Sequence, residues 1–182
     1  MINKTIKKNI NSIKDFPKKG IIFRDITSLL NNKKVFSKII NSISIYAKKN
    51  GINKIIGVES RGFIFASPVA FKNKIPLVLI RKKGKLPRSV FKARYDLEYG
   101  IDELNIHKDS IKKNDRVLVV DDLIATGGTA IACEKLIKKT NIKKINFIFV
   151  IELSDLKGSK KIKNLGHNFK SLCSFSEDEK WI

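Results

Sequence analysis

The sequence predicts an α/β domain with a doubly wound, mostly parallel sheet flanked by helices. Four short apolar runs are too short for helices, and three of them are rich in Val and Ile, as buried parallel strands are. Helical patterns stand between these runs, so the chain alternates strand and helix as parallel strands with crossover helices require. The predicted strands are residues 55–58, 77–80, 117–120 and 147–151.

The first 50 residues predict two amphipathic helices separated by a loop. Near the start, isoleucines recur at spacings of four, four and three, and a second apolar stripe covers residues 35–46 until Asn50 and Gly51 end it. We expect the first helix to dock on the domain. Its isoleucines are Ile2, Ile6, Ile10 and Ile13, and the loop that follows contains Phe16, Pro17 and Gly20.

Later segments complete the predicted domain. Helical patterns follow the first and third strands, over residues 63–71 and 129–139. Residues 154–182 have a Lys-rich segment that ends near Gly166 and an apolar run at 172–175 that predicts an edge strand, and we assign them no chemistry. No repeat or linker divides the chain, so we expect one domain over residues 1–182.

One connection is unusually long. Residues 82–111 show little periodicity, and such long connections inside compact domains are usually functional lids or disordered. In open α/β sheets the ligand lies at the carboxyl ends of the strands. The loops that leave Val58, Ile80 and Val120 meet at that edge, so we expect the chemistry there.

Composition excludes several classes of protein. With 182 residues, 42% of them hydrophobic, the chain is long enough for one core and is not disordered. A net charge of +21 would suit a polyanion, but Lys (32), Ile (29) and Asn (15) are enriched together while Arg numbers only 6. This bias runs through apolar and polar positions alike. We therefore expect no specific nucleic-acid partner, only salt-sensitive sticking to polyanions.

The two cysteines and the N-terminus indicate where the protein works. Cys133 and Cys173 are far apart, with no Cys-x-x-Cys spacing and no paired histidines, so neither a zinc site nor a disulfide framework is indicated. The N-terminus is basic but has no continuous apolar stretch of signal-peptide length. We expect a cytoplasmic protein with no membrane partner.

The strongest functional signal runs from residue 117 to residue 130. A buried strand ends in two adjacent carboxylates, Asp121 and Asp122, and a turn of small residues then opens a helix. Backbone N–H groups and the helix dipole converge there, which favours a bound phosphate. The turn comprises Ala125, Thr126, Gly127, Gly128 and Thr129, whose glycines permit close approach and whose hydroxyls donate hydrogen bonds.

Two carboxylates would repel a phosphate, so these two are expected to face a different part of the ligand. Asp121 and Asp122 suit the 2′ and 3′ hydroxyls of a ribose whose 5-phosphate occupies residues 125–129. The alternative is a capped turn with solvated aspartates, which fits any one of these residues but not the whole run. The run is not a Walker loop, because no Lys-Ser/Thr follows the glycines.

This run resembles the 5-phosphoribosyl-1-pyrophosphate (PRPP) signature of the type I phosphoribosyltransferases. Segments 16–26, 59–63, 81–87 and 95–100 further resemble the adenine phosphoribosyltransferase family. The resemblance covers most of residues 10–150. It implies the type I phosphoribosyltransferase fold with a flexible hood over residues 82–111, and a Mg²⁺-dependent conversion of adenine and PRPP into AMP and pyrophosphate for purine salvage. It also implies a homodimer.

The resemblance assigns the turn after the first strand to pyrophosphate. Arg61 is the natural ligand there, since guanidinium matches phosphate oxygens and Arg is scarce in this chain. Taken alone, Arg61 would be a surface ion-pair partner. Arg81 and Lys85 are also expected on pyrophosphate, either within one subunit or across a dimer interface. The remaining cations of this stretch, Lys82, Lys83 and Arg88, are expected on the surface.

The resemblance also assigns the purine pocket and the acid–base group. The segment within residues 1–32 that carries Ile22, Phe23 and Arg24 would line the pocket, with the Phe23 ring against the base and main-chain groups near Ile22 and Arg24 reading its edge. The Arg24 side chain could equally pair with Asp25 or a neighbour. Glu98 in the hood is the candidate general acid or base, although a structural role is also open.

No dedicated metal ligands are expected from the protein. Mg²⁺ would arrive with PRPP, near Asp121 and Asp122. Two rival functions remain: a phosphoribosyltransferase for an oxopurine, and a PRPP-sensing regulator that binds nucleic acid. Segment 16–26 disfavours the first, and only the net charge supports the second.

Overall fold

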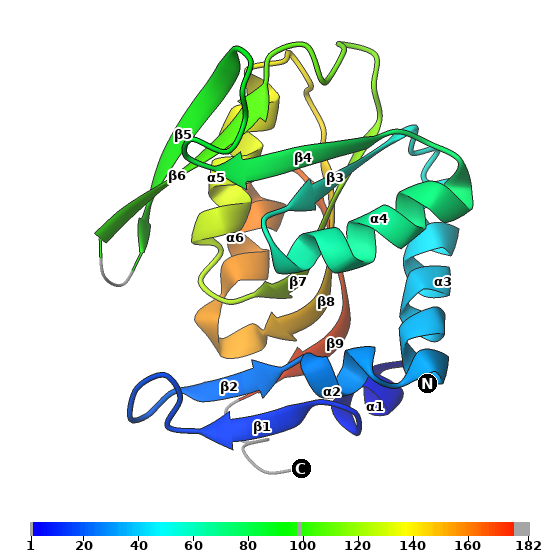
Figure 1. Ribbon diagram of the computed structural model, residues 1–182, viewed down its shortest axis with the longest axis vertical. Coiled ribbons are helices and arrows are strands. Elements are labelled where there is room, and N and C mark those ends of the chain that lie inside the picture. The colour runs from blue at the N-terminus through cyan, green and yellow to red at the C-terminus, as the bar shows by residue number, and fades with distance from the viewer. Residues whose placement is uncertain (1, 98–99, 177–182) are drawn as a thin grey trace.

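The computed structural model describes residues 2–97 and 100–176 of the chain. Its centre is a seven-stranded sheet with the strand order β5-β6-β4-β3-β7-β8-β9, shown in Figure 1. The strands are β3 (Lys54–Val58), β4 (Leu77–Lys82), β5 (Val90–Leu97), β6 (Gly100–His107), β7 (Val117–Ile124), β8 (Asn146–Leu153) and β9 (Asn168–Phe175). The doubly wound, mostly parallel sheet predicted from the sequence is therefore confirmed.

The order in which the parallel strands are added to the sheet changes direction at β3. The chain passes from β3 to β4 on one side and later returns to β7 on the other, and both pairs are parallel. In such sheets the ligand site lies where the strand order reverses, outside the carboxyl ends of the strands. The four predicted strands form the middle of this sheet, so the predicted ligand edge exists.

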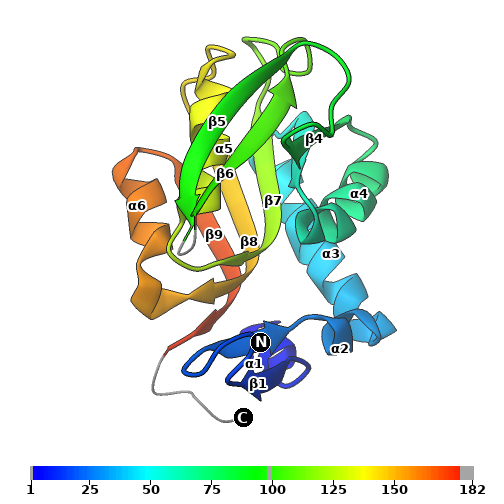
Figure 2. The same ribbon diagram turned by 60° about the vertical axis from the view of Figure 1, so that its left-hand side comes forward.

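Helices cover both faces of the sheet (Figures 1 and 2). One apolar cluster joins the sheet to α3 (Lys33–Lys49) and α4 (Arg61–Asn73), and another joins it to α5 (Gly128–Lys138). Helix α3 begins where the Asn32 side chain accepts hydrogen bonds from the N–H groups of Lys34 and Val35. It ends at Lys49, just before Gly51 at φ +60°, as the sequence predicted.

The first predicted helix is wrong beyond Lys7. Helix α1 (Ile2–Lys7) is short, and β1 (Asn11–Lys14) follows it and pairs antiparallel with β2 (Ile22–Asp25) in a separate hairpin. Ile6 and Ile10 are buried, but Ile13 is exposed on β1. The isoleucine spacing fits a helix, whereas pairing with the distant segment 22–25 decides the structure. Helix α2 (Thr27–Leu30) then leads into α3.

The long excursion is not a structureless loop. Strands β5 and β6 form an antiparallel ribbon, and β6 pairs antiparallel with the end of β4. Ala93, Leu104 and Ile106 are buried in the apolar cluster that also contains α5. The base of the ribbon is therefore packed against the domain, and the predicted flexibility of a hood over residues 82–111 stays a prediction.

The last segment completes the sheet. The turn η1 (Ser154–Leu156) and helix α6 (Gly158–Asn164) connect β8 to β9, which pairs parallel with β8 at the edge of the sheet. This confirms the predicted edge strand at residues 172–175. Cys133 and Cys173 are both buried, as expected.

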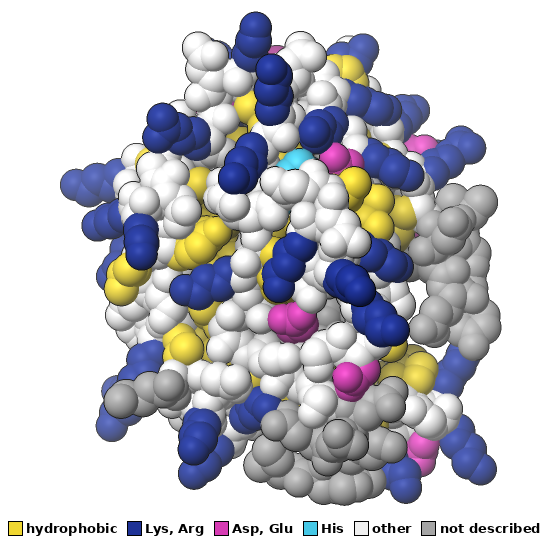
Figure 3. Space-filling model, turned by 180° about the vertical axis from the view of Figure 1, so that it is seen from behind, with side chains coloured by type: hydrophobic (Ala, Val, Ile, Leu, Met, Phe, Trp, Pro, Cys, Tyr) yellow, Lys and Arg dark blue, Asp and Glu magenta, His cyan; other side chains and the backbone are white. Residues whose placement is uncertain are grey.

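On the face of the molecule that Figure 3 shows, the positive charge is spread rather than gathered. Figure 3 shows Lys and Arg side chains scattered over one whole face of the molecule, separated by apolar and uncharged surface. In the described part of the chain, no helix has the length and apolar character needed to cross a membrane.

Candidate active site

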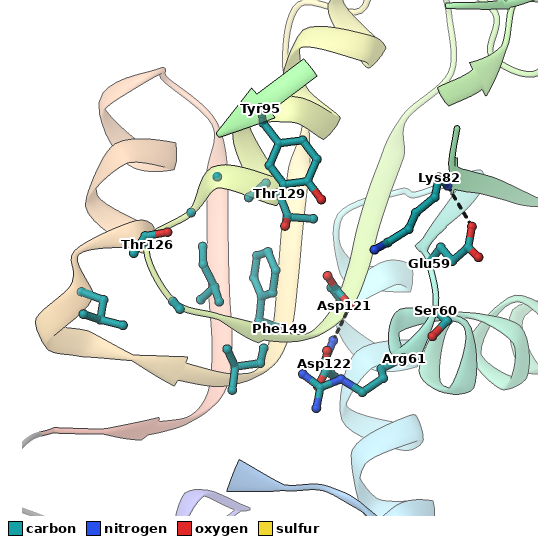
Figure 4. A pocket seen from close by; sticks show the side chains of 17 residues that line it. Glu59, Ser60, Arg61, Lys82, Tyr95, Asp121, Asp122, Thr126, Thr129 and Phe149 are labelled. Carbon is teal, nitrogen blue, oxygen red and sulfur yellow. Dashed lines mark hydrogen bonds and ion pairs between the residues drawn. The ribbon is translucent and has the colours of Figure 1, made fainter. Parts of the chain in front are cut away.

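A cavity of about 720 Å³ opens at the carboxyl ends of β3, β4 and β7. It unites residues from the turn after β3, the end of β4, the ribbon, the end of β7 and the turn after β8 (Figure 4). The described residues that line it are Glu59, Ser60, Arg61, Lys82, Tyr95, Asp121, Asp122, Leu123, Ile124, Ala125, Thr126, Gly127, Gly128, Thr129, Ala130, Phe149 and Leu156. The loops predicted to meet at this edge do meet.

The floor of the cavity carries the adjacent carboxylates of β7. The Asp122 N–H donates a hydrogen bond to Asp121 Oδ1 at 2.9 Å. Burial and the neighbouring Asp122 charge raise the pKa of Asp121 well above its ordinary value, and burial also raises the pKa of Asp122, which Arg61 partly offsets. Two buried, mutually repelling carboxylates are costly, which is typical of groups retained for binding or chemistry.

Helix α4 packs directly on Asp121. A Cβ atom on Gly62 would lie 2.8 Å from both Asp121 Oδ1 and the Val120 carbonyl oxygen. Only glycine therefore allows the start of α4 to approach the end of β7 this closely. The turn before this glycine contains a cis peptide bond between Glu59 and Ser60.

The predicted phosphate loop lies between β7 and α5. Gly127 has φ +86° and precedes the first residue of α5, so the loop places backbone N–H groups at the N-terminus of that helix. All five predicted residues, Ala125, Thr126, Gly127, Gly128 and Thr129, line the cavity. The arrangement suits an anion with phosphate geometry.

Arg61 joins the carboxylates to the β1–β2 hairpin. Its Nη2 atom lies 3.0 Å from Asp122 Oδ2, and its guanidinium carbon lies 5.8 Å from the centre of the Phe23 ring. The Arg61 side chain is 40% exposed, so it faces the cavity as well as its partner. Arg61 therefore forms an ion pair with Asp122 and also lines the cavity, so the two interpretations are compatible.

The cations at the end of β4 and just after it take different positions relative to the cavity. Lys82 lines the cavity, whereas neither Arg81 nor Lys85 is among its described lining residues. Arg81 donates hydrogen bonds to both oxygens of Glu59, at 3.3 and 3.4 Å, and to the Lys85 carbonyl oxygen at 3.3 Å. Lys82 is exposed, as expected, and it also lines the cavity, which the sequence did not predict.

Glu59 organises this corner of the cavity. Burial acts to raise its pKa, but the Lys82 N–H at 2.8 Å and the Arg81 guanidinium outweigh burial and hold the pKa below its ordinary value. The carboxylate therefore stays ionised and orients both cationic residues.

The ribbon contributes Tyr95 to the opposite wall. Its hydroxyl donates to Asp102 Oδ2 at 3.3 Å, and Lys82 Nζ lies 3.1 Å from the same oxygen. Burial, with a contribution from the Asp102 charge, raises the pKa of Tyr95 to about 12. The phenol is therefore a neutral hydrogen-bonding group at physiological pH.

The predicted purine segment lies on β2, beside the cavity. Phe23 packs edge-on against Phe16 with 5.1 Å between the ring centres, and it faces Arg61. The Arg24 side chain points elsewhere: it donates to Ser12 Oγ and stacks on Phe175. Arg24 does not pair with Asp25, whose carboxylate accepts hydrogen bonds from Thr27, so that the pKa of Asp25 is lowered.

One predicted site residue cannot be placed, and three residues that line the cavity were not predicted as site residues. Glu98, the predicted acid or base, lies outside the described residues. Sequence reasoning missed Tyr95, Phe149 and Leu156 as lining residues. Nothing in the local pattern marks Phe149 or Leu156, because they reach the cavity only through the pairing of β7 with β8.

Known proteins resemble this chain over most of its length. A sequence profile of the phosphoribosyl transferase domain matches residues 25–181. The adenine phosphoribosyltransferase of Actinobacillus pleuropneumoniae serotype 5b is 51% identical over 171 residues, covering 94% of this chain and 96% of that protein.

Solved structures agree with the sequence relatives. The adenine phosphoribosyltransferase of Thermoanaerobacter pseudethanolicus matches with a TM-score of 0.88 and 40% identity, covering 96% of this chain and 100% of that one. The enzyme of Giardia lamblia, solved with 9-deazaadenine, matches with a TM-score of 0.90 and 32% identity, covering 96% of this chain and 98% of that one.

The fold, with its carboxylate pair and the loop at residues 125–129, is that of a phosphoribosyltransferase, and the chain belongs to that family. Within it, the chain belongs to the adenine phosphoribosyltransferases. The predicted family and the predicted reaction, phosphoribosyl transfer to adenine in purine salvage, are thereby confirmed.

Proposed function

We propose that this protein converts adenine and PRPP into AMP and pyrophosphate in the cavity at the end of β7. The observation that carries the proposal is the junction of three features around one space: the Asp121–Asp122 pair, the loop at residues 125–129, and Arg61 between that pair and Phe23. Each feature suits a different part of the two substrates.

The loop and the carboxylates would hold the ribose 5-phosphate part of PRPP. Backbone N–H groups of residues 125–129, with the Thr126 and Thr129 hydroxyls, would bind the 5-phosphate at the start of α5. Asp121 and Asp122 would accept hydrogen bonds from the ribose 2′ and 3′ hydroxyls. Burial and the Asp122 charge raise the pKa of Asp121 in the ligand-free protein, and hydrogen bonds from ribose hydroxyls would favour its ionised form.

The cations at the other end of the cavity would hold pyrophosphate. Arg61 and Lys82 line that end. Arg81 lies next to it and donates hydrogen bonds to Glu59 and to the Lys85 carbonyl oxygen, while Glu59 also accepts from the Lys82 N–H. The charge on pyrophosphate grows as its bond to the ribose carbon breaks, so fixed cations here stabilise the transition state more than the ground state.

The donor chemistry of the cavity suits Mg²⁺. Carboxylate oxygens are the ligands this ion prefers, and Asp121 and Asp122 present theirs side by side at the cavity wall. These two residues would hold the ion together with oxygens of PRPP, which would carry it in. When bound, Mg²⁺ supplies positive charge to the departing pyrophosphate.

The purine would lie between the hairpin and the floor of the cavity. Phe23 would stack on the adenine ring while main-chain groups at Ile22 and Arg24 recognise its hydrogen-bonding edge. In the reaction, the bond from ribose C1 to the pyrophosphate oxygen breaks and a bond from C1 to a ring nitrogen of adenine forms. That nitrogen loses its proton, and we assign its acceptance to Glu98.

We also propose that the protein acts as a homodimer. Ile64 and Phe71 lie exposed on α4, and Phe71 is 88% accessible, which supports an apolar contact with a second copy. The predicted cytoplasmic location stays a prediction.

The test is a comparison of five bases with PRPP and Mg²⁺: adenine, hypoxanthine, guanine, xanthine and uracil. We expect AMP and pyrophosphate from adenine and at least about a hundredfold lower kcat/KM with hypoxanthine, because a carbonyl replaces the amino group that the pocket must pair. Preference for an oxopurine would keep the fold and overturn the assigned pocket. PRPP binding without any transfer would favour the PRPP-sensing regulator.

A further inference from the structure

The turn after β8 packs on the loop assigned to the 5-phosphate. The Gly158 N–H donates a hydrogen bond to the Ala125 carbonyl oxygen at 3.1 Å. Gly158 is buried, and Leu156 in the same turn reaches the cavity. Two segments about 30 residues apart in the sequence are thus in direct backbone contact beside the cavity.

The contact leaves no room for a side chain at position 158. A Cβ atom there would lie 2.3 Å from the Ala125 oxygen and 2.9 Å from the Gly127 nitrogen, and both are backbone atoms of the phosphate loop. Gly158 itself does not have a positive φ. Glycine is therefore required here for close approach and not for backbone conformation.

The packing is reciprocal. A Cβ atom on Gly127 would lie 3.1 Å from Gly158 Cα. The turn that delivers Gly158 is held in place, because the Lys157 N–H donates to the Ser154 carbonyl oxygen at 3.1 Å and Ser154 Oγ donates to the Phe175 carbonyl oxygen at 3.0 Å. Lys157 adopts the left-handed conformation, with φ 57° and ψ 17°.

We infer that Gly158 is a positioning residue that fixes the shape of the 5-phosphate loop by packing its backbone against Ala125 and Gly127. The inference rests on the proposed function, because it needs residues 125–129 to bind the 5-phosphate. A loop that binds through backbone N–H groups depends on their direction, and displacement by about 1 Å is enough to lose most of that binding. The effect is confined to this end of the cavity, since pyrophosphate binds at the other.

The test compares Gly158→Ala with Gly166→Ala. Gly166 follows the same helix α6 and has φ +80°, but a Cβ atom there has no neighbour within 4 Å. Gly166→Ala therefore strains the backbone without touching the loop. Binding of ribose 5-phosphate and of Mg²⁺-pyrophosphate is measured by titration calorimetry for the wild type and both variants, with Tm recorded for each.

We expect Gly158→Ala to weaken ribose 5-phosphate binding at least tenfold and to leave pyrophosphate binding within about twofold. Gly166→Ala is expected to leave both affinities unchanged. Equal losses for the two ligands, or no loss, would overturn the inference. A wild-type protein that binds neither ligand and forms no AMP would overturn the proposed function instead, and the inference with it.

A second pair of variants decides the matter if Gly158→Ala does not fold. Lys157→Gly and Lys157→Val both remove an exposed lysine, but glycine accepts the left-handed conformation and valine resists it. We expect the selective loss of ribose 5-phosphate affinity in Lys157→Val alone. The same ribose 5-phosphate affinity in both variants would overturn the inference. If that shared affinity is below the wild-type value, the loss comes from removal of the lysine charge.

Discussion

The guanidinium carbon of Arg24 lies 4.0 Å from the centre of the Phe175 ring, at the end of the last strand of the sheet. Arg24 is only 5% exposed and also donates to Ser12 Oγ on the paired strand. Phe23 precedes it on β2 and faces Arg61, which lines the cavity. Because neighbouring strand residues point to opposite sides, one residue of β2 meets Arg61 while the next anchors the hairpin to the domain.

Arg24→Ala is expected to loosen the purine side of the cavity alone. A buried cation–aromatic contact contributes about 2 kcal/mol, so its loss should raise KM for adenine by roughly tenfold while KM for PRPP changes less than about twofold. Steady-state kinetics with each substrate varied checks this.

Lys7→Ala is the matched control for Arg24→Ala. Lys7 Nζ also lies over the Phe175 ring, at 5.2 Å, but Lys7 is not on the hairpin. Its KM for adenine should stay near the wild-type value. A rise in KM for PRPP equal to that for adenine in Arg24→Ala would contradict a role confined to the hairpin.

Replacing Asp121 and Asp122 together with Asn should preserve the fold and reduce kcat/KM by at least about two orders of magnitude, the size associated with losing a preorganised electrostatic contact. The amides keep the volume but lose the negative charge, and each exchanges one acceptor oxygen for an NH2 donor, which weakens the proposed contacts with ribose hydroxyls and Mg²⁺. Circular dichroism and AMP formation test both halves. A folded, fully active double variant would remove the ribose assignment.

Asp121→Asn alone should stabilise the ligand-free protein at neutral pH. Burial and Asp122 raise the pKa of Asp121, so the folded protein holds a proton at a pH where the unfolded chain, with a pKa of about 3.9, has lost it. Ionisation therefore costs stability, and wild-type stability falls as the pH rises above about 4. We expect the variant to exceed the wild type in Tm by a few degrees at pH 8.

The pH dependence of Tm distinguishes an effect of the Asp121 charge from an effect of packing. The Tm difference between Asp121→Asn and the wild type should shrink as the pH falls toward about 4, because the carboxyl is then protonated in the unfolded chain as well as in the folded protein. Asp122→Asn should stabilise less, since it also breaks the 3.0 Å pair with Arg61. A constant Tm difference across pH would argue against the charge as its cause.

Lys82→Ala should weaken pyrophosphate and PRPP binding, by roughly tenfold or more, because a hydrogen bond to a charged group contributes about 1.5–3 kcal/mol. Lys83→Ala is the neighbouring control, since Lys83 is not among the described residues that line the cavity. Calorimetric titration with pyrophosphate at two salt concentrations measures both. Equal effects of the two variants would point to general surface charge.

Glu98→Gln should lower kcat more than it lowers PRPP affinity, because an acid or base acts on the reacting purine and not on PRPP. Single-turnover rates and PRPP titration separate the two quantities. A loss confined to binding would make Glu98 a positioning residue.

The elements that depend only on residues close together in the sequence could be predicted from the sequence. The buried strands at 55–58 and 117–120, and the loop at 125–129, follow from apolar runs, glycines and adjacent carboxylates within about ten residues. The family resemblance added Arg61, which the structure places at the cavity. These features could be predicted because no distant contact competes with them.

Other features depended on contacts between distant segments. Isoleucine spacing predicted a helix through Ile13, but pairing with residues 22–25 makes β1 a strand. The choice between Arg81 and Lys82 at the cavity depends on the register of β4, and a shift by one residue would reverse it.

The sequence by itself determined the fold class, the reaction family and the loop at residues 125–129, because these are encoded in short, contiguous patterns. Only the tertiary structure decided that Lys82 faces the cavity, that Arg24 anchors the hairpin through Phe175, and that Gly158 packs on the loop. The physical reason is that steric exclusion and side-chain packing act through space, between segments whose approach no local pattern records.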